Sequence, residues 1–247
     1  MEHHQWRATI LSGAGRYADP WHPFSETSEC ISAILRDAGF AVEISERVDE
    51  RMRALATAET RTPDLLVVNV GNPSDPDPAD AATRAGLLAY LNAGGTVLAM
   101  HVSATSFPAI PEWESIVGGI WVRGTTMHPD AGLARIHVYP DRHAIVAPLN
   151  DFELIDERYS YLRVDPGVVP LATHEHGGLK HPLFWAWHYG SARVVYDALG
   201  HDAASFESAT HRQLVRRAAL WLVDGLEADA GTGQPATLGY PARGRGD

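Results

Sequence analysis

The sequence predicts an α/β fold: a three-layer sandwich with a mostly parallel central sheet between two layers of helices. Three apolar runs, at 6–13, 64–70 and 94–101, are typical of buried parallel strands. Segments with helical spacing of apolar residues separate them, so the first hundred residues alternate strongly between strand and helix. Such alternation favours parallel strands joined by right-handed crossovers.

The elements of the first half follow in regular order. The strand at 6–13 precedes a helix expected at 26–39, where Gly39 stands at the C-terminal cap. The remaining expected elements are a strand at 41–45, a weaker helix at about 49–58, the strand at 64–70, a helix at 80–92 and the strand at 94–101.

The second half is less regular, and we expect an irregular insertion at about 102–165 with one clear strand at 134–139. Further elements are expected as strands at 168–173, 184–189 and 192–199, the last two joined by a hairpin at Gly190-Ser191, and a closing helix at 211–225. Together the elements predict one flavodoxin-like domain over residues 1–225. A Gly/Pro/Ala-rich surface tail is expected at 226–247.

The charge and cysteine content exclude some classes of protein. The net charge is -11 and no run of Lys or Arg occurs, so we expect neither nucleic acid nor an anionic membrane as a partner. A single cysteine, Cys30, cannot form an intramolecular disulfide, and the N-terminus lacks a long apolar stretch. These features predict a cytoplasmic protein, and they permit a homo-oligomer without requiring one.

Polar residues stand where several of the expected strands end. His22 follows the first strand, His101 ends the strand at 94–101, and His201 follows the strand at 192–199. If these strands are parallel, their carboxyl ends share one edge of the sheet, which is where open α/β folds bind ligands. The sequence therefore predicts a site at this edge, built by histidines from distant parts of the chain.

Two further clusters carry titratable side chains. His128 lies in the irregular half, and the run DERY places Asp156, Glu157 and Tyr159 close together. Carboxylates of this kind can act as a general acid or base, bind a metal, or contact sugar hydroxyls. The seven tryptophans, Trp187 among them, suit either carbohydrate rings or the core. His174 and His176 are expected in an exposed loop outside the site.

Six short motifs follow one another over about residues 7–224. They are ILSGAGRYADPWHPF (10–24), VLAMHVSATSF (97–107), GGIWVRGTTMHPD (118–130), DERY (156–159), PLFWAW (182–187) and ARVVYDALGHD (192–202). In this order the motifs resemble those of the ThuA-like family of trehalose-utilisation proteins, with Ala99 in place of the usual Gly. The resemblance implies a class I glutamine amidotransferase-like fold and a role in the catabolism of disaccharides or sugar derivatives, including 3-keto sugars. It implies no particular reaction.

The resemblance also points to individual residues, namely His22, His101, His128, Asp156, Glu157, Tyr159, Trp187, His201 and Asp202. Amidotransferases of this fold place a nucleophilic cysteine in the turn after the fourth strand. Here His101 stands at that position and Cys30 lies in the first helix, so a Cys-dependent glutamine amidotransferase is not expected. Ser103 lacks the flanking glycines of a serine-hydrolase turn.

Three functions remain open. The first is an enzyme acting on a small disaccharide or keto-sugar, with His101 and His201 as acid and base and Glu157 as their partner. In this hypothesis the substrate-binding residues are His22, His128, Asp156, Tyr159, Trp187 and Asp202.

The second hypothesis is a metal-dependent hydrolase or isomerase. Its candidate ligands for a divalent ion are His101, His128, His201 and Glu157, although no local motif such as HExxH supports them. No cofactor is firmly expected. The third hypothesis is a non-catalytic sugar-binding protein that uses the same pocket.

Overall fold

The computed structural model describes residues 5–57, 62–73 and 75–225. A single nine-stranded sheet runs through the molecule in the order β2-β1-β3-β4-β11-β10-β9-β6-β7. The expected tail at 226–247 lies outside the described residues. Among the described residues no helix is long and apolar enough to cross a membrane.

The first five strands in this order are parallel to one another. They are β2 (Ala41–Ser45), β1 (Arg7–Ser12), β3 (Leu65–Asn69), β4 (Thr96–Met100) and β11 (Ala192–Asp197). Every residue of β3 and β4 is buried, as expected for strands covered by helices on both faces. The carboxyl ends of these five strands therefore lie along one edge of the sheet.

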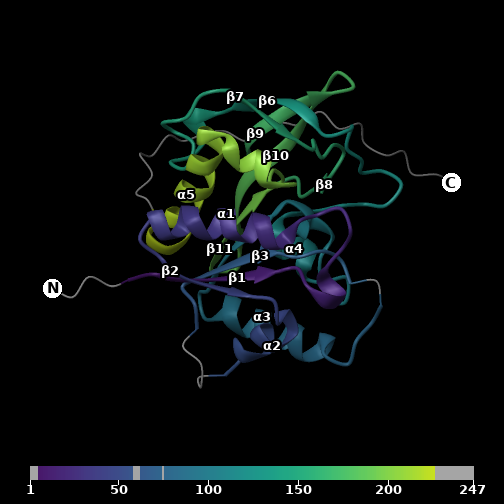
Figure 1. The fold of residues 1–247 in the computed structure, drawn as a ribbon, viewed down its shortest axis with the longest axis vertical. Helices are drawn as coiled ribbons and strands as arrows, with labels where there is room; N and C mark the ends of the chain where they lie inside the picture. The colour runs from purple at the N-terminus through teal and green to yellow at the C-terminus, as the bar shows by residue number, and fades with distance from the viewer. Residues whose placement is uncertain (1–4, 58–61, 74, 226–247) are drawn as a thin grey trace.

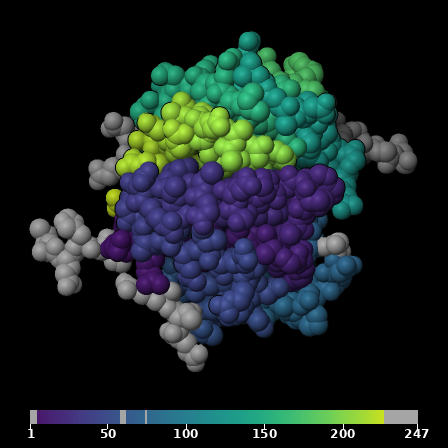
Figure 2. Space-filling view, viewed as in Figure 1, coloured from purple at the N-terminus to yellow at the C-terminus, as the bar shows by residue number. Residues whose placement is uncertain are grey.

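Helices cover both faces of the parallel part (Figure 1). On one face lie α1 (Phe24–Asp37) and α5 (Ala209–Asp224), which form adjacent purple and yellow bands on the molecular surface in Figure 2. On the other face lie α2 (Val48–Ala54) and α3 (Asp80–Asn92). The short α4 (Trp113–Val117) packs on the central strands. The mostly parallel three-layer α/β sandwich is thus confirmed.

An antiparallel extension completes the sheet. It consists of β10 (Leu179–Tyr189), β9 (Pro170–His176), β6 (Gly132–Val138) and β7 (Phe152–Asp156), and β10 joins β11 through the expected hairpin. The strands β5 (Gly119–Ile120) and β8 (Arg163–Val164) form a separate two-stranded sheet. The segment 102–165 therefore adds two strands to the main sheet, β6 and β7, of which the sequence predicted only the first.

One expectation about this region was wrong. His174 lies in β9 and is only 2 % exposed, whereas the sequence predicted an exposed loop. The polar run Thr173-His174-Glu175-His176 hid a strand because β9 buries both Thr173 and His174, and the imidazole of His174 is satisfied by a hydrogen bond. His174 Nε2 donates to the carbonyl of Tyr159 at 3.0 Å.

The direction of β7 matters for the site. Four antiparallel pairings link β7 to β11, namely β7–β6, β6–β9, β9–β10 and β10–β11. Because their number is even, β7 runs parallel to β11. The carboxyl end of β7 therefore points to the same edge as the ends of the parallel strands. There it contacts the 3₁₀ helix η4 (Ala203–Glu207), which follows β11.

Candidate metal centre

Four side chains converge at this edge, and we refer to His22, His101, Glu157 and His201 as the His–Glu cluster. One candidate metal-binding atom from each residue lies within 4.8 Å of the other three. His22 comes from the segment after β1, His101 from the end of β4, Glu157 from the end of β7 and His201 from the segment after β11. The three imidazole rings face one another edge-on, with centroids 5.1–5.5 Å apart.

His101 is held in a strained backbone conformation. Its φ of 39° lies in the left-handed region, a conformation that costs a non-glycine residue about 1–2 kcal/mol. This conformation turns the chain at the end of strand β4. Tyr196 Oη donates to the His101 carbonyl at 2.8 Å, and His101 Nδ1 lies 2.7 Å from the carbonyl of Ala198. Because a carbonyl oxygen only accepts, Nδ1 carries the proton. Nε2 faces the cluster, 3.4 Å from Glu157 Oε2.

His22 is oriented by a local turn in the run Asp19-Pro20-Trp21-His22. The Asp19 carboxylate accepts the backbone N–H groups of Trp21 and His22, as in other aspartate turns. The same carboxylate lies 2.8 Å from His22 Nδ1 through either oxygen, so Nδ1 carries a proton and Nε2 presents its lone pair. Burial and the neighbouring His101 lower the pKa of His22 to about 4, despite Asp19, which keeps its imidazole neutral.

His201 and Glu157 complete the cluster. His201 Nδ1 lies 3.4 Å from Glu157 Oε2, the same oxygen that faces His101. Burial alone would raise the pKa of Glu157, but His101 and the other histidines lower it below its usual range, so the carboxylate is charged. Conversely, burial would lower the pKa of His101, and Glu157 and Asp156 outweigh that effect and raise it.

The donor atoms of the cluster suit a divalent transition metal. Three buried nitrogens, His22 Nε2, His101 Nε2 and His201 Nδ1, have no hydrogen-bond partner. Unpartnered buried polar atoms are costly and uncommon, and each of these has a partner on its other nitrogen or its backbone. Imidazole and carboxylate ligands favour ions such as Zn²⁺, Mn²⁺, Fe²⁺ or Co²⁺ over Ca²⁺ and Mg²⁺. The residues present therefore fit a divalent transition-metal ion.

The His–Glu cluster differs from the predicted candidate metal ligands in a single residue. His22, expected among the substrate-binding residues, lies inside the cluster, and the predicted metal ligand His128 lies outside it. His128 has a side chain 36 % exposed, with Nδ1 3.5 Å from Glu157 Oε1. The spacing of Asp19 and His22 is a sequence signal for an oriented imidazole that the prediction did not use.

An aromatic wall flanks the cluster. The buried Tyr159 ring lies 4.3 Å from the His101 ring, and Trp121 packs edge-on against Tyr159 at 4.8 Å. His128 stands beside both rings, with centroids 5.9 Å away. Tyr159 and His128 thus lie beside the cluster as expected, and Trp121, one of the tryptophans considered as a stacking surface, is a neighbour that was not among the predicted site residues.

The other three predicted residues make contacts elsewhere in the protein. Asp156 is buried, and its carboxylate accepts four hydrogen bonds from the protein. Asp202 caps η4 by accepting from the Ala204 N–H. Trp187 pairs with Val194, three positions from the end of β11, and its indole donates to the carbonyl of Ser115. Hydrogen bonds within the protein thus occupy the Asp156 carboxylate, one oxygen of Asp202 and the Trp187 indole, and the expected substrate contacts of these residues stay predictions.

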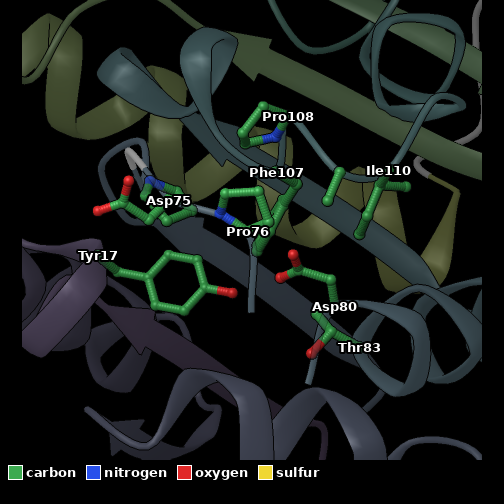
Figure 3. A pocket seen from close by; sticks show the side chains of 10 residues that line it. Tyr17, Asp75, Pro76, Asp80, Thr83, Phe107, Pro108 and Ile110 are labelled. Carbon is green, nitrogen blue, oxygen red and sulfur yellow. The ribbon is translucent and has the colours of Figure 1, made fainter. Parts of the chain in front are cut away.

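A cavity of about 210 Å³ also opens beyond the ends of β1, β3 and β4. Figure 3 shows its walls, which include Tyr17, Phe107 and Pro108. Two of its polar side chains are already paired, since Tyr17 Oη donates to Asp49 and Asp80 accepts from Arg16. No residue of the His–Glu cluster lines it. The chemistry therefore points to the cluster rather than to this cavity.

Solved structures with the same fold come from several bacteria. ThuA-like proteins from Parabacteroides merdae and Bacteroides uniformis superpose with TM-scores of 0.71 and 0.70, at 18 % and 16 % identity. Each match covers 90 % of this chain, and 91 % and 93 % of the respective relative. A glutamine amidotransferase from Thermotoga maritima matches over 90 % of this chain and 100 % of its own, with a TM-score of 0.55 and 10 % identity. At these identities the likeness shows the fold alone.

Sequence comparison identifies the family. No curated protein matches the chain. The family model for ThuA, described as trehalose utilisation, matches residues 7–222, which span the first strand to the last helix. The chain therefore belongs to the ThuA family, which implies a role related to sugar utilisation.

Proposed function

We propose that the chain is a metal-dependent enzyme of sugar metabolism. In this proposal His22, His101, His201 and Glu157 hold one divalent transition-metal ion, and a sugar-derived substrate binds between the ion and the aromatic wall. The observation that carries it is the convergence of three unpartnered buried nitrogens on one charged carboxylate. The family supplies the substrate class, since its description is trehalose utilisation.

A bound ion would supply Lewis acidity, which polarises a carbonyl or activates water. The protein would supply orientation and proton transfer. Trp121 offers an aromatic surface beside Tyr159, of the kind that packs on the apolar face of a sugar ring. His128, half-exposed and next to Glu157, is placed to exchange protons with both substrate and solvent. This arrangement suits hydrolysis or isomerisation of a disaccharide or its keto derivative.

Metal-free acid–base chemistry is the second candidate. It is favoured by the two 3.4 Å distances that join Glu157 Oε2 to His101 and His201. In that case His101 and His201 would be acid and base, as in the first hypothesis drawn from the sequence. A sugar-binding protein without turnover would use the same residues for positioning only.

The metal content of protein purified without added metal or chelator separates these candidates. We expect about one equivalent of a transition metal by elemental mass spectrometry, lost in His101→Ala and in His22→Ala. The control is His188→Ala, an exposed histidine in β10 outside the cluster. The loaded protein would next be screened for turnover of disaccharides and their keto forms. Wild-type protein that takes up no metal, even after incubation with Mn²⁺, Co²⁺ or Zn²⁺, would refute the metal proposal.

A further inference from the structure

A buried row of polar side chains connects helix α5 with the His–Glu cluster. It consists of Asp197 at the end of β11, His211 in α5, Ser205 in η4 and Asp156 at the end of β7. All four are at most 2 % exposed. None of them belongs to the cluster, and the proposed function gives them no task.

His211 is a buried cation, as its hydrogen bonds require. Nε2 lies 3.0 Å from Asp197 Oδ2, and Nδ1 lies 3.0 Å from the carbonyl oxygen of Ser205. A carboxylate and a carbonyl oxygen both accept, so both ring nitrogens carry protons. Burial opposes this charge, but Asp197 and then Asp156 outweigh burial and raise the pKa of His211.

Ser205 connects His211 to Asp156 through hydrogen bonds. Its hydroxyl lies 3.0 Å from His211 Nδ1 and donates to Asp156 Oδ2 at 2.5 Å. A hydroxyl that donates to one side and accepts from the other has a single orientation. The row Asp197–His211–Ser205 therefore fixes where one oxygen of the Asp156 carboxylate lies.

Asp156 in turn holds two residues of the cluster. Its Oδ1 accepts the backbone N–H groups of Glu157 at 2.8 Å and His201 at 3.2 Å. Its Oδ2 accepts the N–H of Gly200, whose φ of 106° turns the chain after β11. Since β7 and β11 are not neighbours in the sheet, this one carboxylate joins the ends of two separate strands.

We propose that Asp156 is a positioning residue that sets the separation of Glu157 and His201, and that Ser205, His211 and Asp197 hold it in place. The inference rests on the proposed function, because its effect is on metal affinity. Outer partners of metal ligands act in this way, and their loss typically costs about 10- to 100-fold in affinity.

Ser205→Ala tests the proposal with a small change. It removes the hydroxyl between His211 and Asp156 and leaves the Ser205 carbonyl, which also binds His211, in place. Asp156→Asn is the stronger variant, because an amide cannot accept all of the bonds that the carboxylate accepts. The matched control is Thr96→Val, which removes one hydroxyl hydrogen bond at the opposite end of β4.

The readouts are Co²⁺ and Zn²⁺ affinity by competition with a chromophoric chelator, the visible spectrum of the Co²⁺-loaded protein, and the Tm of each metal-free variant. We expect Ser205→Ala to bind metal about 10- to 100-fold more weakly and to shift the Co²⁺ bands, with Asp156→Asn weaker still. Thr96→Val should change Tm alone.

The outcomes separate this inference from the proposed function. Wild-type protein that binds no metal would refute both. Wild-type binding with unchanged affinity and spectrum in Ser205→Ala would refute the positioning role and leave the metal centre intact. If Asp156→Asn does not fold, Ser205→Ala alone decides, since it deletes a single oxygen atom.

Discussion

The parallel half of the sheet and its antiparallel extension form their parts of the site in different ways. In the parallel half, a local turn orients His22 through Asp19, three residues away. The other cluster residues depend on distant segments. His101 is bonded to Tyr196 and Ala198, and the carboxylate at the end of β7, in the extension, holds Glu157 and the turn at His201. A local turn orients His22, and long-range hydrogen bonds support the other three residues. The two halves are therefore expected to respond differently to substitution.

The largest expected effect follows from removing the negative charge of Glu157 from the His–Glu cluster. Glu157→Gln keeps the size of the side chain, but a neutral amide cannot balance a divalent ion beside three imidazoles. We expect metal affinity, measured by chelator competition, to fall by more than about 100-fold, beyond the range for outer partners. His128→Gln, which alters the histidine next to Glu157 outside the cluster, should retain the metal. Equal losses in both variants would move His128 into the ligand set.

A smaller effect is expected for the local turn of the parallel half. Asp19→Asn retains an acceptor for backbone N–H groups but weakens the pairing that keeps the proton on His22 Nδ1. Metal affinity should fall by about 10- to 100-fold, with little change in Tm. If Asp19→Asn destabilises the protein as much as Asp156→Asn does, the distinction between local and long-range support is wrong.

The smallest expected effect concerns stability in the antiparallel half, outside the site. Burial first, and then the nearby His181 and Arg158, lower the pKa of His174 to about 4 from the ordinary 6.5, despite its bond to Tyr159. Between these values the unfolded chain binds more protons than the folded one, so stability is lost as pH falls from about 6.5 to 4. This group should contribute a loss of about 1–3 kcal/mol.

Denaturant unfolding at pH 7 and pH 4 measures that contribution. His174→Gln retains a side-chain donor for the Tyr159 carbonyl but has no titrating group, so its stability should fall less on acidification than that of the wild type. His137→Gln, an exposed histidine of β6, is the control. A wild type and a His174→Gln variant with the same acid sensitivity would contradict the buried neutral state of His174.

The same contrast explains how far prediction from the sequence reaches. The helix expected at 80–92 matches α3 in both bounds, because periodicity and strand burial are local properties of the parallel half. In the other half, the sequence did not predict β7. Exposed Glu153 and Ile155 interrupt its buried residues, and the strand ends on the carboxylate of Asp156. The fold class depends only on local periodicity and strand burial, and it was predicted correctly.

The sequence predicts which side chains lie together where strand ends alone decide their position. His101, His201 and Glu157 meet because their strands end at one edge. Which of His22 and His128 lies in the cluster depends on the loop after β1 and on the Asp19–His22 spacing, a signal that the prediction did not use. The occupation of Asp156 by Ser205 and two N–H groups of the β11 turn depends on segments more than forty residues away.

The origin of the four cluster residues has a consequence for how the fold is held together. They come from segments that follow β1, β4, β7 and β11, and so extend from residue 22 to residue 201. An ion held by all four would act as a cross-link between segments that meet only in the folded state. It would restrict the unfolded chain in the manner of closed loops, and its binding energy would add to the stability of the native state. Removal of the ion by a chelator would then lower the stability of this edge of the sheet as well as abolish activity.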